Sequence, residues 1–431
     1  MRLNYKRTFF VGLAFMSICC FWQLYDNIIP LMLKNTFGLG ETVTGMLMAL
    51  DNVLALFLLP LFGSLSDKVD TPLGKRTPFI IGGTFVAVIA MTFIPVANKA
   101  ASMILFVLFL GIVLVAMGSY RSPAVALMPD LTPKPLRSKA NSIINLMGAF
   151  GGVYTLVMIK VLVKEGTDYQ AVFLSVSAVM VIAVVLLVII IREKKLSATI
   201  DLEAGAVHNT EKDQQEAGQT PLAIDDKMPA DVRKSFILLL ASIFLWFTAY
   251  NAVTTAYSRY VEQVWKLKAG GFADSLLVAT IAAIFSYIPI GIIATRIGRK
   301  KTIIGGIVMM TASYLCGALF TEYSALINVV FAFTGIGWAA INVNSYPMVV
   351  EMCKGSDIGK YTGLYYTFSM SAQILTPIVS GALLEYISYR TLFPYAVAFS
   401  VASLCTMLFV MHGDSRPVRK KDLIESFDSE D

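Results

Sequence analysis

Three charged residues lie inside long apolar stretches of this chain: Asp26, Asp51 and Arg121. A charge held deep in a lipid bilayer costs about 2.5–3.5 kcal/mol on insertion scales, so each of these residues is a functional candidate. An aspartate in such a place can take up and release a proton, and Arg121 can contact a substrate or pair with one of the acids. The alternative is a structural role, in which the charge is bonded to a neighbouring helix.

The spacing of these charges places the two aspartates at one level and Arg121 somewhat deeper, within reach of a central site. Asp26 and Asp51 each lie 8 residues from the loop that joins their two stretches, and Arg121 lies 9 residues before Asp130, where its own stretch ends. At the helical rise of about 1.5 Å per residue, each aspartate lies about 12 Å below the outer surface of the membrane and the arginine about 13 Å above the inner surface. This geometry allows all three to face one central cavity.

Other residues that often carry chemistry are poorly placed for it. The two histidines, His208 and His412, lie in a polar segment and at the end of the last apolar stretch, so any proton coupling must use carboxylates. The 5 cysteines lie in or beside apolar runs without a CxxC pair, which argues against a disulfide framework or a metal site. There is no Walker sequence and no enzymatic constellation. We therefore expect no metal, no cofactor and no enzyme activity.

Twelve apolar stretches must position the buried charges. Hydrophobic residues make up 56% of the 431 residues and charged residues 15%, against about 25% charged in soluble proteins. This composition excludes a disordered protein, a nucleic-acid-binding module and an ordinary cytosolic enzyme. Core helices of a soluble protein would keep a polar face, and we interpret the first stretch as a retained helix rather than a signal peptide. The predicted spans are 8–34, 43–66, 77–98, 100–128, 139–161, 169–191, 235–258, 272–295, 302–321, 323–351, 358–384 and 391–412.

Loop charges predict the orientation. With the N-terminus inside, the inner loops and tails hold 26 of the 35 lysines and arginines, and the outer loops hold 8. Positive charge accumulates on the cytoplasmic side of membrane proteins. We therefore expect a multi-pass protein of the cell membrane with both termini in the cytoplasm.

The chain divides into two halves. Residues 1–191 are expected to form an N-terminal six-helix bundle and 235–412 a C-terminal one, joined by a cytoplasmic, largely disordered linker over 192–234 and followed by a cytoplasmic tail over 413–431. Asp130 and Glu351, which close the fourth and tenth spans, are 221 positions apart. The lysines that open the following spans have the same offset. Such a repeat is typical of transporters with parallel halves.

The loop after the second span carries a motif. Gly63-Ser-Leu-Ser-Asp67-Lys68 followed by Gly74-Lys75-Arg76 resembles the signature loop of the major facilitator superfamily. The longer string PLFGSLSDKVDTPLGKRTPFI is similar to the sucrose/proton symporters and, more distantly, to the glycoside–pentoside–hexuronide cation symporters. SPAVALMPDLTP at the end of the fourth span, and Trp22-Gln23-Leu24 in the first, resemble the sucrose carriers as well. The resemblance implies an all-α integral membrane protein with twelve transmembrane helices in two six-helix pseudo-symmetric bundles, the major facilitator fold.

Two positions depart from these relatives. Melibiose-type carriers have aspartates one and five residues before the proline that matches Pro60, where this chain has Leu59 and Ala55, so their sodium site does not carry over. Sucrose carriers have an arginine where this chain has Val125, and here the arginine lies close to one helical turn earlier, at Arg121. The sucrose site therefore carries over only approximately.

Polar and aromatic side chains gather inside several spans, as hydroxyl recognition beside aromatic platforms requires. The alternatives are ordinary: amides bind membrane helices together, and aromatic residues form belts at the membrane surface. Together with Arg121, the candidates for substrate binding are Trp22, Gln23, Tyr25, Asn141, Asn145, Trp246, Tyr250, Asn251, Thr254, Trp338, Asn342, Tyr365, Tyr366 and Gln373.

The signature loop is expected to form a gate. Charges there can make ion pairs at the cytoplasmic face, and the resemblance implies that such pairs latch the outward-facing state. Anchoring by positive charge alone would explain Lys75 and Arg76 but not Asp67. Thr295 replaces the signature aspartate in the second half, so we expect a weaker latch there. The gate candidates are Gly63, Asp67, Lys68, Gly74, Lys75, Arg76, Asp130, Arg137 and Glu351.

These features predict a secondary transporter that works by alternating access, with proton-coupled symport of a sugar or glycoside as its activity and Asp26 or Asp51 as the proton site. Its partners would be a small molecule, the proton and the lipid bilayer, with no nucleic acid, and we expect a monomer. The first alternative is a proton-driven exporter of a drug or metabolite. The second is a non-transporting membrane sensor.

Overall fold

The computed structural model describes residues 3–132, 136–163, 168–197, 229–267, 270–352 and 358–414. The side chains of 137–139, 358–360 and 362 are outside this description, and so are His208, Cys353 and most of the predicted linker and tail. Within the described residues, twelve helical segments are long and apolar enough to cross a membrane. The prediction of an all-helical membrane protein is confirmed.

The helices follow the predicted order, and most extend beyond the predicted spans by a few residues at one or both ends. They are α1 (Tyr5–Asn35), α2 (Glu41–Lys68), α3 (Thr77–Lys99), α4 (Met103–Asp130), α5 (Arg137–Leu162), α6 (Gln170–Ile190), α8 (Ala230–Val264), α9 (Ala273–Ile297), α10 (Arg299–Leu319), α11 (Leu326–Glu351), α12 (Ile358–Tyr386) and α13 (Leu392–Leu408), with a short 3-10 helix, η2 (Tyr389–Thr391), before the last.

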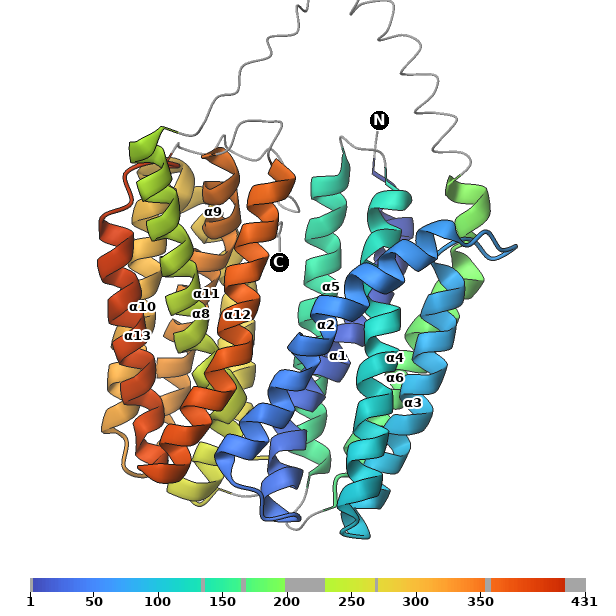
Figure 1. Ribbon diagram of the computed structural model, residues 1–431, viewed down its shortest axis with the longest axis horizontal. Helices are drawn as coiled ribbons and strands as arrows, with labels where there is room; N and C mark the ends of the chain where they lie inside the picture. The colour runs from blue at the N-terminus through green and yellow to red at the C-terminus, as the bar shows by residue number, and fades with distance from the viewer. Residues whose placement is uncertain are drawn as a thin grey trace, which may run out of the picture.

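The helices form two groups, α1 to α6 and α8 to α13 (Figure 1). In the first group α1 packs on α5 and α6, and α4 packs on α2 and α3; in the second α8 packs on α12 and α13, and α11 packs on α9 and α10. Each packing pair in one group therefore has a counterpart in the other. This correspondence is the pseudo-symmetry expected from the repeat; the exact domain boundaries remain a prediction.

The two groups touch through α2 on α12, α5 on α9 and α1 on α8. A glycine allows the first of these contacts, because a Cβ atom on Gly45 would lie 2.1 Å from the carbonyl oxygen of Pro377. Gly45 lies near the start of α2, and the contact is therefore at the end of the molecule opposite to that where α1 begins and α13 ends. We call the end where α1 begins the tail end and the opposite end the far end.

Large apolar side chains cover the outward faces of the helices. Ile104 is 82% exposed and Phe85 is 67% exposed, and both lie on helices long enough to span a membrane. In water such a surface would be unstable, but in lipid it has no cost. Polar chemistry is consequently confined to the two ends and to the space between the groups.

Candidate functional site

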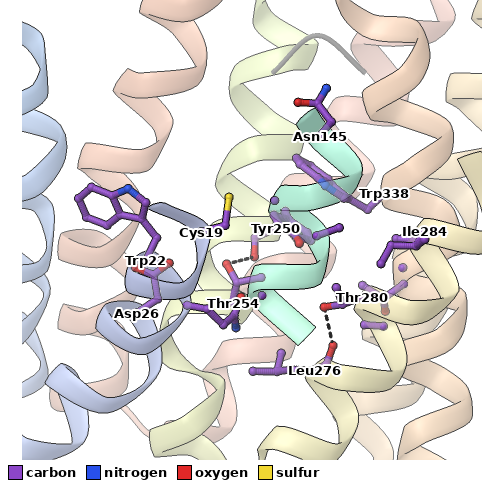
Figure 2. A pocket seen from close by; sticks show the side chains of 18 of the residues that line it. Cys19, Trp22, Asp26, Asn145, Tyr250, Thr254, Leu276, Thr280, Ile284 and Trp338 are labelled. Atoms are coloured by element: carbon purple, nitrogen blue, oxygen red, sulfur yellow. Dashed lines mark hydrogen bonds between the residues drawn. The ribbon is translucent and has the colours of Figure 1, made fainter. Parts of the chain in front are cut away.

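A cavity of about 450 Å³ lies between the two groups. Its lining comes from α1, α4 and α5 on one side and from α8, α9, α10 and α11 on the other, and Figure 2 shows many of these side chains. Nine of the predicted residues line it: Trp22, Gln23, Asp26, Arg121, Asn145, Tyr250, Asn251, Thr254 and Trp338.

The remaining predicted residues are not part of this lining. Tyr25 is buried beside it, where its hydroxyl donates to the carbonyl of Met48 at 3.3 Å. The hydroxyls of Tyr365 and Ser345 are 3.2 Å apart in the second group. The others outside the lining are Asp51, Asn141, Trp246, Asn342, Tyr366 and Gln373. Their roles stay predictions.

The first wall holds the charges. Asp26, Asp51 and Arg121 come from α1, α2 and α4 and are close enough to interact electrostatically. Asp51 accepts a hydrogen bond of 2.8 Å from the amide of Asn52. The guanidinium of Arg121 lies over the ring of Trp22, 5.7 Å from its centroid, a favourable cation–π contact.

The second wall is aromatic and apolar. The rings of Tyr250 and Trp338 are stacked, with centroids 3.8 Å apart and planes at 7°, and Phe247 meets Trp338 edge-on. Aliphatic residues of α9, including Leu276 and Ile284, continue this wall (Figure 2). Tyr250 and Thr254 are four residues apart on α8, a spacing that places both side chains on one face of the helix.

Hydroxyls of this second wall donate within their own helices. Thr254 donates to the carbonyl of Tyr250 at 3.2 Å, and Thr280 donates to that of Leu276 at 2.8 Å. Their oxygen atoms keep lone pairs that can accept from a ligand. The cavity thus combines a charged wall with an aromatic wall that also offers acceptors.

The signature loop forms ion pairs within the first group at the tail end. The guanidinium of Arg76 contacts Asp67 through one terminal nitrogen and Asp130 through Nε at 2.8 Å. It also donates to the hydroxyl of Ser66 and the carbonyl of Gly63. Among these groups Arg76 is buried, whereas Asp67 is 62% exposed.

The second group has a similar pair, although it lacks the signature aspartate. Arg299 pairs with Glu351, the position that corresponds to Asp130. The hydroxyl of Thr295 donates within its own helix, to the carbonyl of Ile292. The side chain of Arg137 lies outside the described residues.

A second carboxylate in each group holds the start of a helix and was missed by sequence reasoning. Glu193, just after α6, accepts from the backbone N–H groups of Lys75, Arg76 and Thr77 at 2.7–2.9 Å. Asp414, just after α13, accepts from the backbone N–H of Lys300 at 2.7 Å. Both cap a helix that starts with unpaired N–H groups. Their separation of 221 positions, the same as that of the span-closing acids, is the signal that would have found them.

The far end holds a buried carboxylate that was also missed. Glu41 is 2% exposed and accepts from Nε of Arg259 at 2.6 Å and from Lys34 at 2.7 Å. The hydroxyl of Tyr389 donates to the same carboxylate. Lys34 and Arg259 are two of the 8 basic residues predicted for the outer loops. Hydropathy alone cannot show that helices α1, α2 and α8 bring both of them to Glu41.

Every ion pair that joins the two groups within the described part of the chain lies at the far end. Besides the pair of Glu41 with Arg259, Lys160 at the end of α5 pairs with Asp274 at the start of α9. The amide of Asn35 also donates to Glu262 across this junction. Among the described residues, ion pairs therefore lock the groups together at the far end and not at the tail end.

Two packed groups of helices, long and apolar enough to cross a membrane, thus enclose a central cavity with one charged wall and one aromatic wall, an architecture typical of membrane transporters. The sequence matches the model of the Major Facilitator Superfamily over residues 11–286 and 266–427. The chain belongs to this superfamily.

Curated relatives resemble only a part of the chain. An uncharacterized MFS-type transporter of Mycobacterium tuberculosis is 25% identical over 158 residues, which are 36% of this chain and 21% of the relative. The MFS-type efflux transporter pyiT of Pyricularia grisea is 27% identical over 123 residues, 28% of this chain and 20% of that protein. The matched segment thus spans about a fifth of the length of these relatives.

Solved structures show the same fold. A POT family transporter in complex with a thioalcohol-conjugated peptide has a TM-score of 0.70 at 10% identity, covering 94% of this chain and 95% of that one. The nucleoside transporter NupG has a TM-score of 0.67 at 13% identity, covering 93% and 98%. At these identities the likeness establishes the major facilitator fold and nothing about the substrate.

Proposed function

We propose that the protein is a secondary active transporter that couples a proton to the movement of a sugar or glycoside by symport. The observation that carries this proposal is the central cavity, where a carboxylate lies opposite stacked aromatic rings and among amides and hydroxyls. Asp26 supplies the proton site within the cavity, and Asp51 is its neighbour. The cation that could neutralise both is Arg121, which contacts the ring of Trp22.

The contacts between the groups support alternating access. In the described part of the chain, one buried and one largely exposed ion pair join the two groups at the far end, while the ion pairs at the tail end stay within each group. In the proposed orientation the tail end is cytoplasmic, so the structure represents a state closed to the outside. Transport requires the far-end pairs to open while the tail end closes.

The resemblance of the signature loop to the sucrose carriers favours a sugar or glycoside. The cavity offers the groups that sugars need: amides from Asn145 and Asn251, hydroxyls such as Thr254, and an aromatic platform. We also propose that the protein acts as a monomer in the cell membrane.

A proton-driven exporter is the second candidate. It is supported by the similarity to an efflux transporter over 123 residues and by the apolar α9 wall of the cavity. The two candidates differ in direction, not in fold or in the need for a proton site.

Uptake into proteoliposomes tests the proposal. The full chain is reconstituted, a pH gradient is imposed, and a panel of labelled disaccharides and glycosides is offered with and without a protonophore. We expect accumulation of at least one sugar that the protonophore abolishes. Asp26→Asn or Asp51→Asn should abolish accumulation and leave counterflow exchange partly intact.

A matched control removes a carboxylate that is far from the cavity. Asp168 pairs with Lys99 in an exposed position, so Asp168→Asn should accumulate like the wild type. If Asp26→Asn and Asp51→Asn both accumulate sugar normally, the assignment of the proton site is wrong. If the gradient drives efflux from preloaded vesicles but no uptake, the exporter is correct.

A further inference from the structure

The cation of the central cavity has no anion as a close partner. Within the described residues no carboxylate oxygen lies within 4.0 Å of Arg121, and Arg121 donates no hydrogen bond. Arg121 is half-buried, and the two fully buried arginines differ from it: Arg76 binds two carboxylates, and Arg259 binds Glu41. Arg121 alone among these three offers its full set of donors to the cavity it lines.

The carboxylate of the same cavity, that of Asp26, also has no close partner among the described residues. Asp26 accepts no hydrogen bond from another residue of the described chain, and it is not paired with Arg121 although the two interact electrostatically. The ionisable groups around Asp26 are Tyr25 on the same helix, Asp51 on α2 and Arg121 on α4. Two opposite charges thus share one cavity without closing on each other.

Charge balance favours joint binding of an anion and a proton. An anion bound to Arg121 adds one negative charge to the cavity, and a proton on Asp26 adds one positive charge. The loaded and the empty cavity then carry the same net charge, whatever the state of Asp51. Since moving a net charge through a low-dielectric interior is costly, this equality removes a barrier to the conformational change.

The opposite wall suits a flat ring. Tyr250 and Trp338 are stacked on each other, so their combined surface is a rigid platform. Aromatic platforms bind other aromatic rings and the apolar faces of sugar rings. Leu276 and Ile284 extend this surface without adding charge.

Resting on the transport function proposed above, we propose that the substrate is an organic carboxylate with a ring-shaped body, such as a sugar acid or an aromatic glycoside acid. The carboxylate binds the guanidinium of Arg121, and the ring lies against Tyr250 and Trp338. A proton from the solvent neutralises Asp26 at the same time. Arg121 is therefore the residue that selects the charge of the substrate.

Binding of matched probe pairs to the purified full chain tests this inference. The first pair is 4-nitrophenyl β-D-glucuronide and 4-nitrophenyl β-D-glucoside, and the second is 4-hydroxycinnamate and its amide. We expect the carboxylate of at least one pair to bind ten-fold or more tightly than its neutral partner in isothermal titration. Arg121→Gln should remove this preference, and Arg121→Lys should retain part of it because the positive charge remains.

Proton uptake is a second readout. Titrations in two buffers of different ionisation enthalpy should show uptake of about one proton per carboxylate bound, and Asp26→Asn should remove that uptake. Thermal unfolding of each variant verifies that it is folded, and Lys99→Gln, a change in an exposed pair, should leave binding unchanged.

The outcomes separate this inference from the proposed function. If no carboxylate is preferred in either pair, or if Arg121→Gln keeps the preference, the inference is overturned. If carboxylates bind through Arg121 but a pH gradient does not drive their accumulation, the inference stands and proton-coupled transport fails. If a neutral sugar is accumulated equally by the wild type and Arg121→Gln, transport stands and the inference fails.

Discussion

Neutralising Glu41 should open the far end of the molecule. Its carboxylate is 2% exposed and binds Arg259, which is 3% exposed, together with Lys34 and Tyr389. In Glu41→Gln both cations lose their counter-charge, and Arg259 stays buried while Lys34 is half-buried. Removing one partner of a buried ion pair costs about 3–5 kcal/mol.

This cost falls only on the state that is closed at the far end, because the same groups are hydrated when that end is open. Each 1.4 kcal/mol is about a factor of ten in an equilibrium constant. The ratio of far-end-open to far-end-closed molecules should therefore rise by a factor of about a hundred to a few thousand. The glutamine can still accept one hydrogen bond, which favours the lower figure.

Thiol labelling measures this shift. Cys19 lines the central cavity, so a membrane-impermeant thiol reagent applied from the far-end side reaches it only when the far end opens. We expect Glu41→Gln to be labelled at least ten-fold faster than the wild type, with Cys19→Ser as the background. Glu262→Gln is the matched control, since its bond to Asn35 is exposed and should contribute little.

If labelling of Glu41→Gln from the far-end side is as slow as in the wild type, the buried carboxylate does not hold the closed state. If Glu262→Gln accelerated the labelling of Cys19 as much as Glu41→Gln does, the reasoning would also be refuted, because the loss of any carboxylate at the junction would then open the far end.

Three further changes have defined outcomes. Glu193→Gln weakens the charged cap of α3 and should lower the unfolding free energy by about 1 kcal/mol, seen as a lower Tm in detergent, with no effect on far-end labelling. Gly45→Val should prevent α2 from closing on α12, because its Cβ would overlap a carbonyl oxygen, and should accelerate thiol labelling as strongly as the loss of the ion pair. The pKa of Asp168 is lowered by the backbone N–H of Gln170 and by Lys99, so its stabilising effect is present above the usual aspartate pKa and is lost as the pH falls through the lowered pKa. The Tm difference between Asp168→Asn and the wild type should accordingly shrink in acid; a constant difference would contradict this assignment.

The fold could be predicted from the sequence because a lipid bilayer imposes a simple rule on the segments that cross it. Each span must be apolar over its whole length, and that pattern is visible without any knowledge of packing. The central charges were predictable for the same reason: Asp26, Asp51 and Arg121 stand out against an apolar background. The structure places Asp26 and Arg121 in the cavity lining and Asp51 beside it.

Residues at the helix ends were not predictable in this way. Glu41, Glu193 and Asp414 lie in or near loops, where charge is common and carries no signal of its own. Their importance comes from partners that are distant in the sequence, such as Arg259, which is 218 positions from Glu41. Hydropathy also could not separate Trp246, which is buried outside the cavity lining, from Tyr250, which is one helical turn away and lines the cavity.

The distribution of ion pairs suggests how the two ends alternate. At the far end the pairs join the groups, and at the tail end Arg76 and Arg299 are each held within their own group. The pairs within each group keep the tail ends of the helices rigid, so that opening of that end does not unfold them.

Asp67 differs from the other acids of these tail-end pairs, since its side chain is 62% exposed while it contacts Arg76. On the proposed mechanism, the exposed oxygen of Asp67 contacts α12 when the tail end closes, because α2 packs on α12 along the junction of the two groups. Asp67→Asn should therefore shift the population toward the state of the present structure and slow far-end labelling of Cys19, the opposite of the change expected at Glu41; faster labelling would show that Asp67 serves only the first group.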